Sequence, residues 1–174
     1  MSFFNRLRRQ HKPHNSVSSK PGLIGLDIRS HSLHLCQLRP EANNRFTIVA
    51  KSSTGFDGSR EQLLDSPKAF KTLIARATRG KNFKGNKVTA IIPPEDVRII
   101  LLSYKASVTD VDAEVMRMLS QRVKGNIDDY VVDYLPVRKN STDEEHIVMA
   151  SVALRSRVEQ FLAVLTNAGL QVHS

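Results

Sequence analysis

The stretch IGLDIRSHSL, residues 24–33, joins an apolar segment to a short polar turn and then begins a second apolar segment. Residues 23–28 are mostly apolar, which is typical of a strand covered on both faces. Residues 29–32 predict the turn, and a second strand follows with the apolar side chains Leu33, Cys36 and Leu38. The stretch therefore predicts a β-hairpin at the start of the folded chain.

The residues after this hairpin complete a first block. Residues 46–51 follow an alternating pattern and predict a third strand, whereas residues 52–65 are rich in Ser and Gly and predict a loop. Ser66 and Pro67 predict the start of a helix, because a hydroxyl caps free amides and proline suits the first turn. The apolar face of this helix has Phe70, Leu73, Ile74 and Ala77. With a short strand at 88–92, which Pro93 ends, residues 22–95 predict a βββαβ subdomain.

A second block follows at once. Residues 97–104 predict a strand, and Thr109 with Asp112 predicts the cap of a helix. Two further strands are expected at 130–137 and 147–153, separated by a charged loop.

The chain ends with a helix and the beginning of another element. Ser156 and Glu159 predict a capping box that opens the helix, and Gly169 predicts its end. Residues 96–170 therefore predict an inserted βαββα subdomain in a mixed α/β fold. We expect residues 171–174 to open a further strand, either of a truncated chain or of a degenerate remnant of a larger fold.

Composition limits the class of protein. The chain has 174 residues, of which 40% are hydrophobic and 25% charged, as in ordinary globular proteins. It has no apolar run near the roughly 20 residues that span a bilayer. Its single cysteine, Cys36, excludes an intrachain disulfide. We therefore expect a cytoplasmic protein.

The net charge of +9 is unevenly distributed. Residues 1–20 hold five basic side chains, and the first acid in the chain is Asp27. Because residues 1–21 show no sustained periodicity, we expect a flexible basic tail. Its residues favour reversible docking on an anionic membrane surface, through Phe3, Phe4, Arg6, Leu7, Arg8 and Arg9.

The sequence resembles PilM-type proteins, the actin-like scaffolds of type IV pilus machines, in two respects. Residues 24–33 resemble the first phosphate loop of the actin-like ATPase superfamily, which wraps nucleotide phosphates with backbone amides. The order of later segments is also similar. Residues 88–93 match the strand before the family's inserted subdomain, VVDY at 131–134 resembles a run inside it, and residues 167–170 resemble its end. The resemblance covers residues 22–174 and implies the N-terminal half of such a protein.

The resemblance implies a phosphate loop formed by Gly25, Asp27, Arg29, Ser30 and Ser32. Arg29 stands where the family has a glycine, and its side chain is expected to oppose a tight turn. The family's second phosphate loop lies in a lobe beyond these residues. We therefore expect a vestigial site, no cofactor in this chain and no ATPase activity, although ATP and Mg²⁺ are possible in a full-length family member.

The resemblance also implies a function. PilM-type scaffolds lie at the periphery of the inner membrane and hold the short cytoplasmic tail of a PilN-type partner between two subdomains. Pro93 and Pro94 stiffen the link between the two predicted blocks, so we expect a groove there, with Arg98 and Ile100 as candidate contacts. Cytoplasmic domains of type II secretion platforms fit the sequence as well.

An alternative from another class is a ribonuclease H-like nucleic-acid enzyme, which shares the βββαβ opening. It would hold two metal ions through Asp27 and acids such as Glu95 or Asp96. The βαββα insertion is not expected in that class and much of the excess charge lies in the tail, so we expect no nucleic-acid partner.

Other chemistry-bearing residues have simpler interpretations. His31 and His34 are three apart, which on a strand places them on opposite faces, so we expect no metal site. Cys36 is expected to be a buried small residue. A basic cluster forms either a solvated helix end or a surface for acidic partners; it consists of Arg76, Arg79, Lys81, Lys84 and Lys87.

Overall fold

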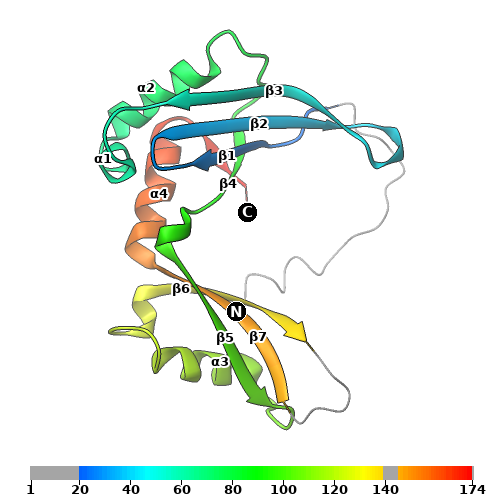
Figure 1. Ribbon diagram of the computed structural model, residues 1–174, viewed down its shortest axis with the longest axis vertical. Helices are drawn as coiled ribbons and strands as arrows, with labels where there is room; N and C mark the ends of the chain where they lie inside the picture. Colours follow the sequence, from blue (N-terminus) through cyan, green and yellow to red (C-terminus); the bar gives the residue numbers. More distant parts are fainter. Residues whose placement is uncertain (1–19, 139–144, 174) are drawn as a thin grey trace. The chain divides into compact units, whose positions relative to one another are not determined.

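The structure, a computed structural model, describes residues 20–138 and 145–173 (Figure 1). The predictions for the tail, including its membrane-surface residues Phe3 to Arg9, lie outside the described residues. The chain forms two compact units. The first unit comprises residues 20–93 and 159–173, and the second unit residues 94–158.

A five-stranded sheet in the order β3-β2-β1-β4-β8 forms the first unit. Its strands are β1 (Ile24–Ile28), β2 (Ser32–Pro40), β3 (Phe46–Gly55), β4 (Lys87–Ala90) and β8 (Gln171–Val172). The first three form an antiparallel meander, with the 3-10 turn η2 (Ala42–Asn44) between β2 and β3. β4 pairs parallel with β1, and β8 pairs parallel with β4. The predicted hairpin and the two strands expected after it are therefore confirmed.

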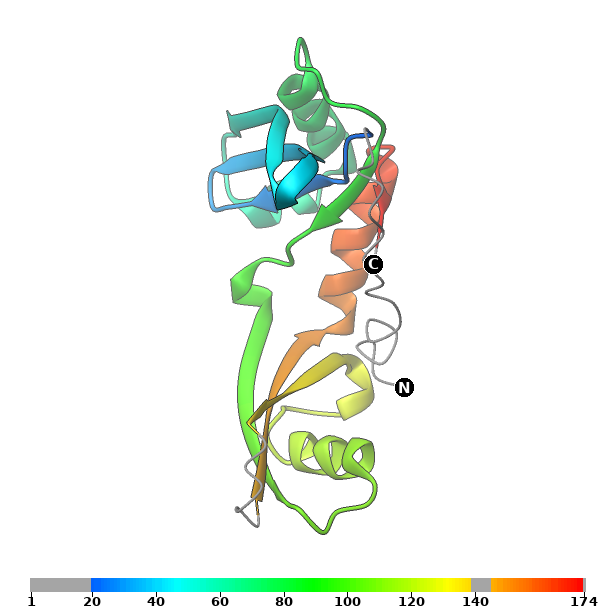
Figure 2. The ribbon, with the colours of Figure 1, turned by 90° about the vertical axis from the view of Figure 1, so that its right-hand side faces the viewer.

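Three helices pack on one face of this sheet (Figure 2): α1 (Arg60–Leu64), α2 (Pro67–Thr78) and α4 (Arg155–Asn167). Ser66 caps α2 as predicted, because its hydroxyl accepts the amide of Ala69 at 3.4 Å. The predicted apolar face of α2 is buried in the core. The same core takes alternate residues of the strands, namely Ile24, Leu26, Ile28, Leu33, Leu35 and Val88.

The other face of the sheet, the open face, corrects two predictions. β1 is not covered on both faces, because Gly25 and Asp27 point away from the core and stay half-exposed. Because successive side chains of β2 point to opposite faces, Leu35 and Gln37 lie on the same buried face as Leu33. Cys36 therefore lies on the open face and is exposed, so the prediction of a buried cysteine is wrong.

The segment expected to be a loop, residues 52–65, is more ordered than its Ser/Gly content suggests. β3 continues to Gly55, and α1 follows after a short turn. A capping box starts α1: the Ser59 hydroxyl accepts the Gln62 amide at 3.2 Å, and the Gln62 side chain accepts the Ser59 amide at 3.0 Å.

The second unit is a three-stranded antiparallel sheet with one helix against one of its faces (Figure 2). The strand order is β5-β7-β6. Its elements are η3 (Pro94–Asp96), β5 (Val97–Lys105), α3 (Val111–Ser120), η4 (Ile127–Asp129), β6 (Tyr130–Arg138) and β7 (Glu145–Leu154). The cap of α3 is Asp110, which accepts the Ala113 amide at 3.0 Å, rather than the predicted Thr109.

The last helix does not belong to the inserted subdomain as predicted. α4 begins at Arg155, directly after β7, so Ser156 lies inside the helix instead of capping it. Its apolar residues Phe161, Val164 and Leu165 enter the core of the first unit, and β8 then joins the sheet of that unit. The chain therefore leaves the second unit within α4 and not at residue 170. No helix in the described ranges has the length and apolar content needed to cross a bilayer.

Candidate functional site

The turn between β1 and β2 contains the residues of the expected phosphate loop. The amide of Arg29 donates to the carbonyl of Ser32 at 2.9 Å and closes the turn. Among the non-glycine residues that the structure describes, only Asn43 and Asn44 have positive φ. Arg29 therefore fits this turn without the conformation that favours glycine, and the expectation that its side chain opposes the turn is wrong.

The charge of Asp27 is paired inside the same turn. Nε of Arg29 donates to Oδ2 of Asp27 at 3.0 Å, with both side chains in contact with solvent. An exposed ion pair of this kind stabilises the fold by at most about 1 kcal/mol. The pairing also bears on ligands, because the guanidinium competes with a metal ion for Oδ2 of Asp27.

The two serines of the loop differ in their contacts. The Ser32 hydroxyl lies 2.9 Å from Nε2 of His34, whereas Ser30 is exposed. His31 lies in the turn, with Nδ1 3.2 Å from the carbonyl of Gly58. The predicted loop residues are thus brought together, but the hydroxyl of Ser32 already has a partner within the protein.

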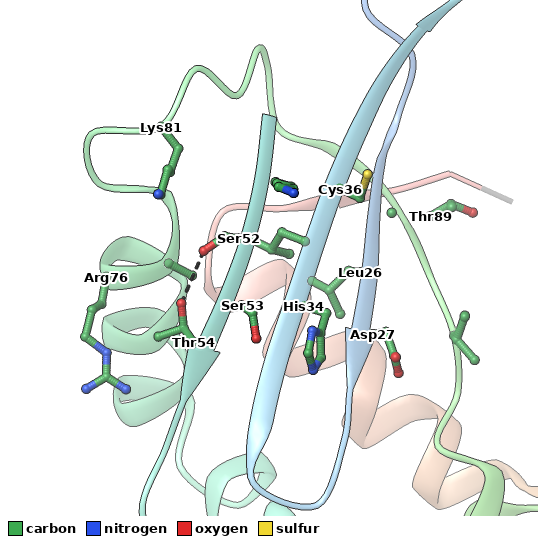
Figure 3. Close-up of a pocket in the computed structure, with 15 residues that line it drawn as sticks. Leu26, Asp27, His34, Cys36, Ser52, Ser53, Thr54, Arg76, Lys81 and Thr89 are labelled. Atoms are coloured by element: carbon green, nitrogen blue, oxygen red, sulfur yellow. Dashed lines mark hydrogen bonds between the residues drawn. The ribbon is translucent and has the colours of Figure 1, made fainter. Parts of the chain in front are cut away.

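Asp27 and His34 are direct neighbours on the open face (Figure 3). Ser53 on β3 continues the same row, and Gly25, Cys36 and Lys51 form the next one. Ser52 and Thr54 point to the helix-covered side, where their hydroxyls lie 3.2 Å apart (Figure 3). Both rows line an open pocket of about 900 Å³, to which the apolar residues Leu26, Leu35 and Ile91 also contribute. A Cβ added at Gly25 would lie 3.5 Å from the carbonyl of Cys36, an ordinary contact, so packing does not require this glycine.

The acids of the alternative, nuclease-like site belong to different units. Asp27 lies in the first unit, whereas Glu95 and Asp96 form η3 at the start of the second. Within residues 20–138 and 145–173, no group of three or more His, Cys, Asp or Glu side chains is placed to hold a metal ion.

β5 carries the two predicted partner contacts, on the face of its sheet that α3 covers. Ile100 packs against the core of the second unit, and Arg98 is exposed near the start of the strand. The apolar side chains that β5 exposes are instead Ile99 and Leu101, at 57% and 61%. The sequence pattern could not identify these two residues. Residues 97–102 are all apolar apart from Arg98, so alternation does not show which face of the strand points outward.

The outer face of this sheet, the face away from α3, has apolar side chains on all three strands, together with the polar residues Ser103, Asp133 and Ser151. Cross-strand pairing places Leu101 opposite Met149, and Met149 opposite Leu135. Val131 and Ile147 are further exposed members of this face. An exposed apolar area spread over several neighbouring strands is typical of an interaction surface.

The covered face of the second unit holds one strongly perturbed group. The hydroxyl of Tyr134 donates to Oδ1 of Asp112 on α3. Burial, and then this hydrogen bond, raise the pKa of Tyr134 well above its ordinary value. Because the phenol stays neutral and ties β6 to α3, its role is structural.

No protein-family model matches the chain, and no curated protein does. The observed architecture is a mixed α/β fold of the actin-like class, and solved structures share it. One is titled "PilM-PilN type IV pilus biogenesis complex": it matches with a TM-score of 0.69 at 19% identity, over 87% of this chain and 46% of that one. This chain therefore has the PilM-type fold that its sequence resembles.

A second solved structure is the cytoplasmic domain of EpsL, an inner membrane component of the type II secretion system of Vibrio cholerae. It matches with a TM-score of 0.50 at 12% identity, over 88% of this chain and 56% of that domain. The chain thus spans about half the length of each of these two structures. At these identities the likeness shows the fold.

Proposed function

We propose that this chain is a scaffold of a type IV pilus or related secretion platform, which binds the short cytoplasmic tail of a PilN-type inner-membrane protein. One observation carries the proposal: β5 presents exposed apolar side chains at the edge of a sheet, in a fold shared with a PilM–PilN complex. The groove predicted between the two subdomains remains a prediction, because each unit is described by itself.

β5 suits an extended peptide for two reasons. In the described part of the chain β5 pairs with β7 alone, so backbone groups along its outer edge are available to another strand. The carbonyl of Leu101 already accepts from Nη1 of Arg122 at 2.9 Å, which such a strand would have to accommodate. Its outer-face side chains Ile99 and Leu101 give apolar contacts for alternate residues of such a peptide. Arg98, on the opposite face of β5 and exposed, supplies a donor for a carbonyl or carboxylate.

The proposed function involves no catalysis and no bound nucleotide. The Arg29 guanidinium pairs with the Asp27 carboxylate, and the Ser32 hydroxyl lies 2.9 Å from Nε2 of His34, so both groups already have partners within the protein. We propose that the turn between β1 and β2 is a structural remnant in this chain, so that partner binding does not depend on ATP.

A matched pair of substitutions tests the scaffold proposal. Ile99→Asp and Ile48→Asp each place a carboxylate at an exposed isoleucine on an edge strand, at 57% and 55% exposure, but in different sheets. Burying one such side chain against a peptide contributes about 1.5–3 kcal/mol, so Ile99→Asp is expected to weaken binding about 10- to 100-fold. Ile48→Asp is expected to bind like the wild type.

The assay is fluorescence anisotropy with a labelled N-terminal peptide of a PilN-type protein from the same organism. A peptide that does not bind the wild type contradicts the scaffold assignment. Equal losses in both variants contradict the placement on β5. Arg98→Glu adds a third arm, in which reversal of an exposed charge is expected to lower affinity without unfolding.

A further inference from the structure

A strongly cationic surface lies on the first unit, whereas the proposed peptide site lies on the second. Between Asp65 and Glu95 the chain has seven basic residues and no acid. All seven side chains are exposed. We call them the cationic surface: Lys68, Lys71, Arg76, Arg79, Lys81, Lys84 and Lys87.

The first four of these residues lie on the outer side of α2 and its C-cap. At 100° per residue, Lys68, Lys71, Arg76 and Arg79 fall opposite the face that buries Phe70, Leu73, Ile74 and Ala77. Basic residues at the end of a helix complement its dipole, which accounts for Arg76 and Arg79. The helix dipole does not account for Lys68 and Lys71 in the first turns of α2, nor for the three lysines in the segment that follows α2.

The loop that carries the other three cations is fixed to the sheet. The side chain of Gln37, only 1% exposed, donates to the carbonyl of Lys84 and accepts its amide, both at 2.8 Å. Asn86 donates to the carbonyl of Gly169 at 2.8 Å. With its backbone held at these points, the loop presents Lys81, Lys84 and Lys87 from a defined scaffold.

The positive charges of the cationic surface are not neutralised by ion pairs in the described part of the chain. Within the part of the chain that the structure describes, no carboxylate pairs with any of the seven. Arg76 donates to the carbonyl of Gly55, and this contact leaves its charge uncompensated. A partner with many negative charges is therefore the complement of this surface.

The residue types indicate which anionic partner fits. Five of the seven are lysines, which act as point charges and suit a diffuse layer of phosphates better than a single bidentate ligand. Single-stranded nucleic acid is held by exposed aromatic platforms, whereas Phe70 is buried and Phe83 packs against the core. We propose that the cationic surface docks the first unit on anionic phospholipid. This inference rests on the proposed function in one respect: a partner inserted in the inner membrane keeps the chain beside lipid.

Full-length variants with equal changes in net charge test the proposal. The test variant combines Lys71→Gln, Lys81→Gln and Lys84→Gln, and the control combines Arg45→Gln, Lys105→Gln and Lys124→Gln. All six side chains are exposed, so neither variant is expected to unfold. Residues 1–19 are the same in both, and their contribution to membrane binding therefore cancels.

The assay is cosedimentation with phosphatidylcholine vesicles, with and without phosphatidylglycerol. The wild type is expected to bind only the anionic vesicles, and to dissociate as salt rises from about 0.1 to 1 M, because the screening length falls from about 10 to 3 Å. Each charge removed at such a surface weakens binding about fivefold. The test variant is therefore expected to lose about 100-fold in partition coefficient, and the control less than about fivefold.

Three results overturn the proposal: wild type that sediments equally with neutral and anionic vesicles, equal losses in both variants, or tighter binding to duplex DNA or RNA than to vesicles at the same salt concentration. The last result assigns the surface to nucleic acid. Binding of the PilN-type peptide is measured separately and is expected to be unchanged in the test variant. Failure of lipid binding with intact peptide binding thus rejects this inference alone.

Discussion

Replacing Gln37 with leucine tests how the first unit is held together. Gln37 is buried at 1% exposure, and its amide group makes three hydrogen bonds, each 2.8 Å long. Two of them hold the backbone of Lys84, 47 residues away, and the third holds the carbonyl of Gly22. Gln37→Leu removes all three while keeping a side chain of similar size.

The expected loss follows from these contacts. A hydrogen bond contributes about 1 kcal/mol net, so three contribute about 3 kcal/mol. Water that reaches the exposed loop lowers this figure, and polar groups left unpaired raise it, so we expect a loss of about 2–4 kcal/mol in the free energy of unfolding. The control is Gln121→Leu, an exposed glutamine at the end of α3, which is expected to change stability by less than about 0.5 kcal/mol.

Urea denaturation gives the free energies, and amide hydrogen exchange at Lys84 tests the local cause. In Gln37→Leu the Lys84 amide is expected to lose protection while amides of β7 keep theirs. A loss below about 0.5 kcal/mol, or a Lys84 amide that stays protected, refutes the reasoning that this side chain anchors the loop.

Three further predictions concern other parts of the chain. Calorimetric titration with magnesium-ATP is expected to show no micromolar binding, because the Arg29 guanidinium pairs with the Asp27 carboxylate; micromolar affinity that Asp27→Ala abolishes contradicts this. Ser59→Ala removes half of the capping box of α1 and is expected to cost about 1 kcal/mol, with an unchanged free energy of unfolding as the opposing result. The raised pKa of Tyr134 means that the folded state holds this proton more tightly than the unfolded state. Its contribution is therefore complete below the unfolded pKa of about 10 and declines above it, so stability is expected to fall less steeply above pH 10 in Tyr134→Phe; an identical pH profile contradicts the assignment.

The order of strands and helices follows from local signals, and the sequence predicted most of it. The turn at residues 29–32, the helix start at Ser66 and the apolar face of α2 each depend on neighbouring residues. The predicted burial pattern of β2 was wrong by one position. Cys36 is the more apolar of the two neighbouring residues and was expected to be buried, but the structure buries Gln37. Its partners lie 15 and 47 residues away, and local pattern carries no information about them.

The prediction of the partner contacts on β5 was limited by the same lack of information about tertiary contacts. In β5 almost every residue is apolar, so composition cannot say that Ile100 faces α3 while Ile99 and Leu101 face outward. α4 follows β7 in sequence but packs with β1 and β4 of the other unit, which misplaced the predicted subdomain boundary. Both errors arise because tertiary contacts, and not neighbouring residues, decide which face of an amphipathic element is buried.

The central claim is that β5 receives the tail of a membrane partner. Backbone amide chemical shifts of the ¹⁵N-labelled chain, recorded while the PilN-type N-terminal peptide is added, test it most directly. The account predicts shifts concentrated in β5, from Val97 to Lys105, with no change in β3, an edge strand of the other sheet. Shifts that leave β5 unaffected at saturating peptide, or no shifts anywhere, would contradict it.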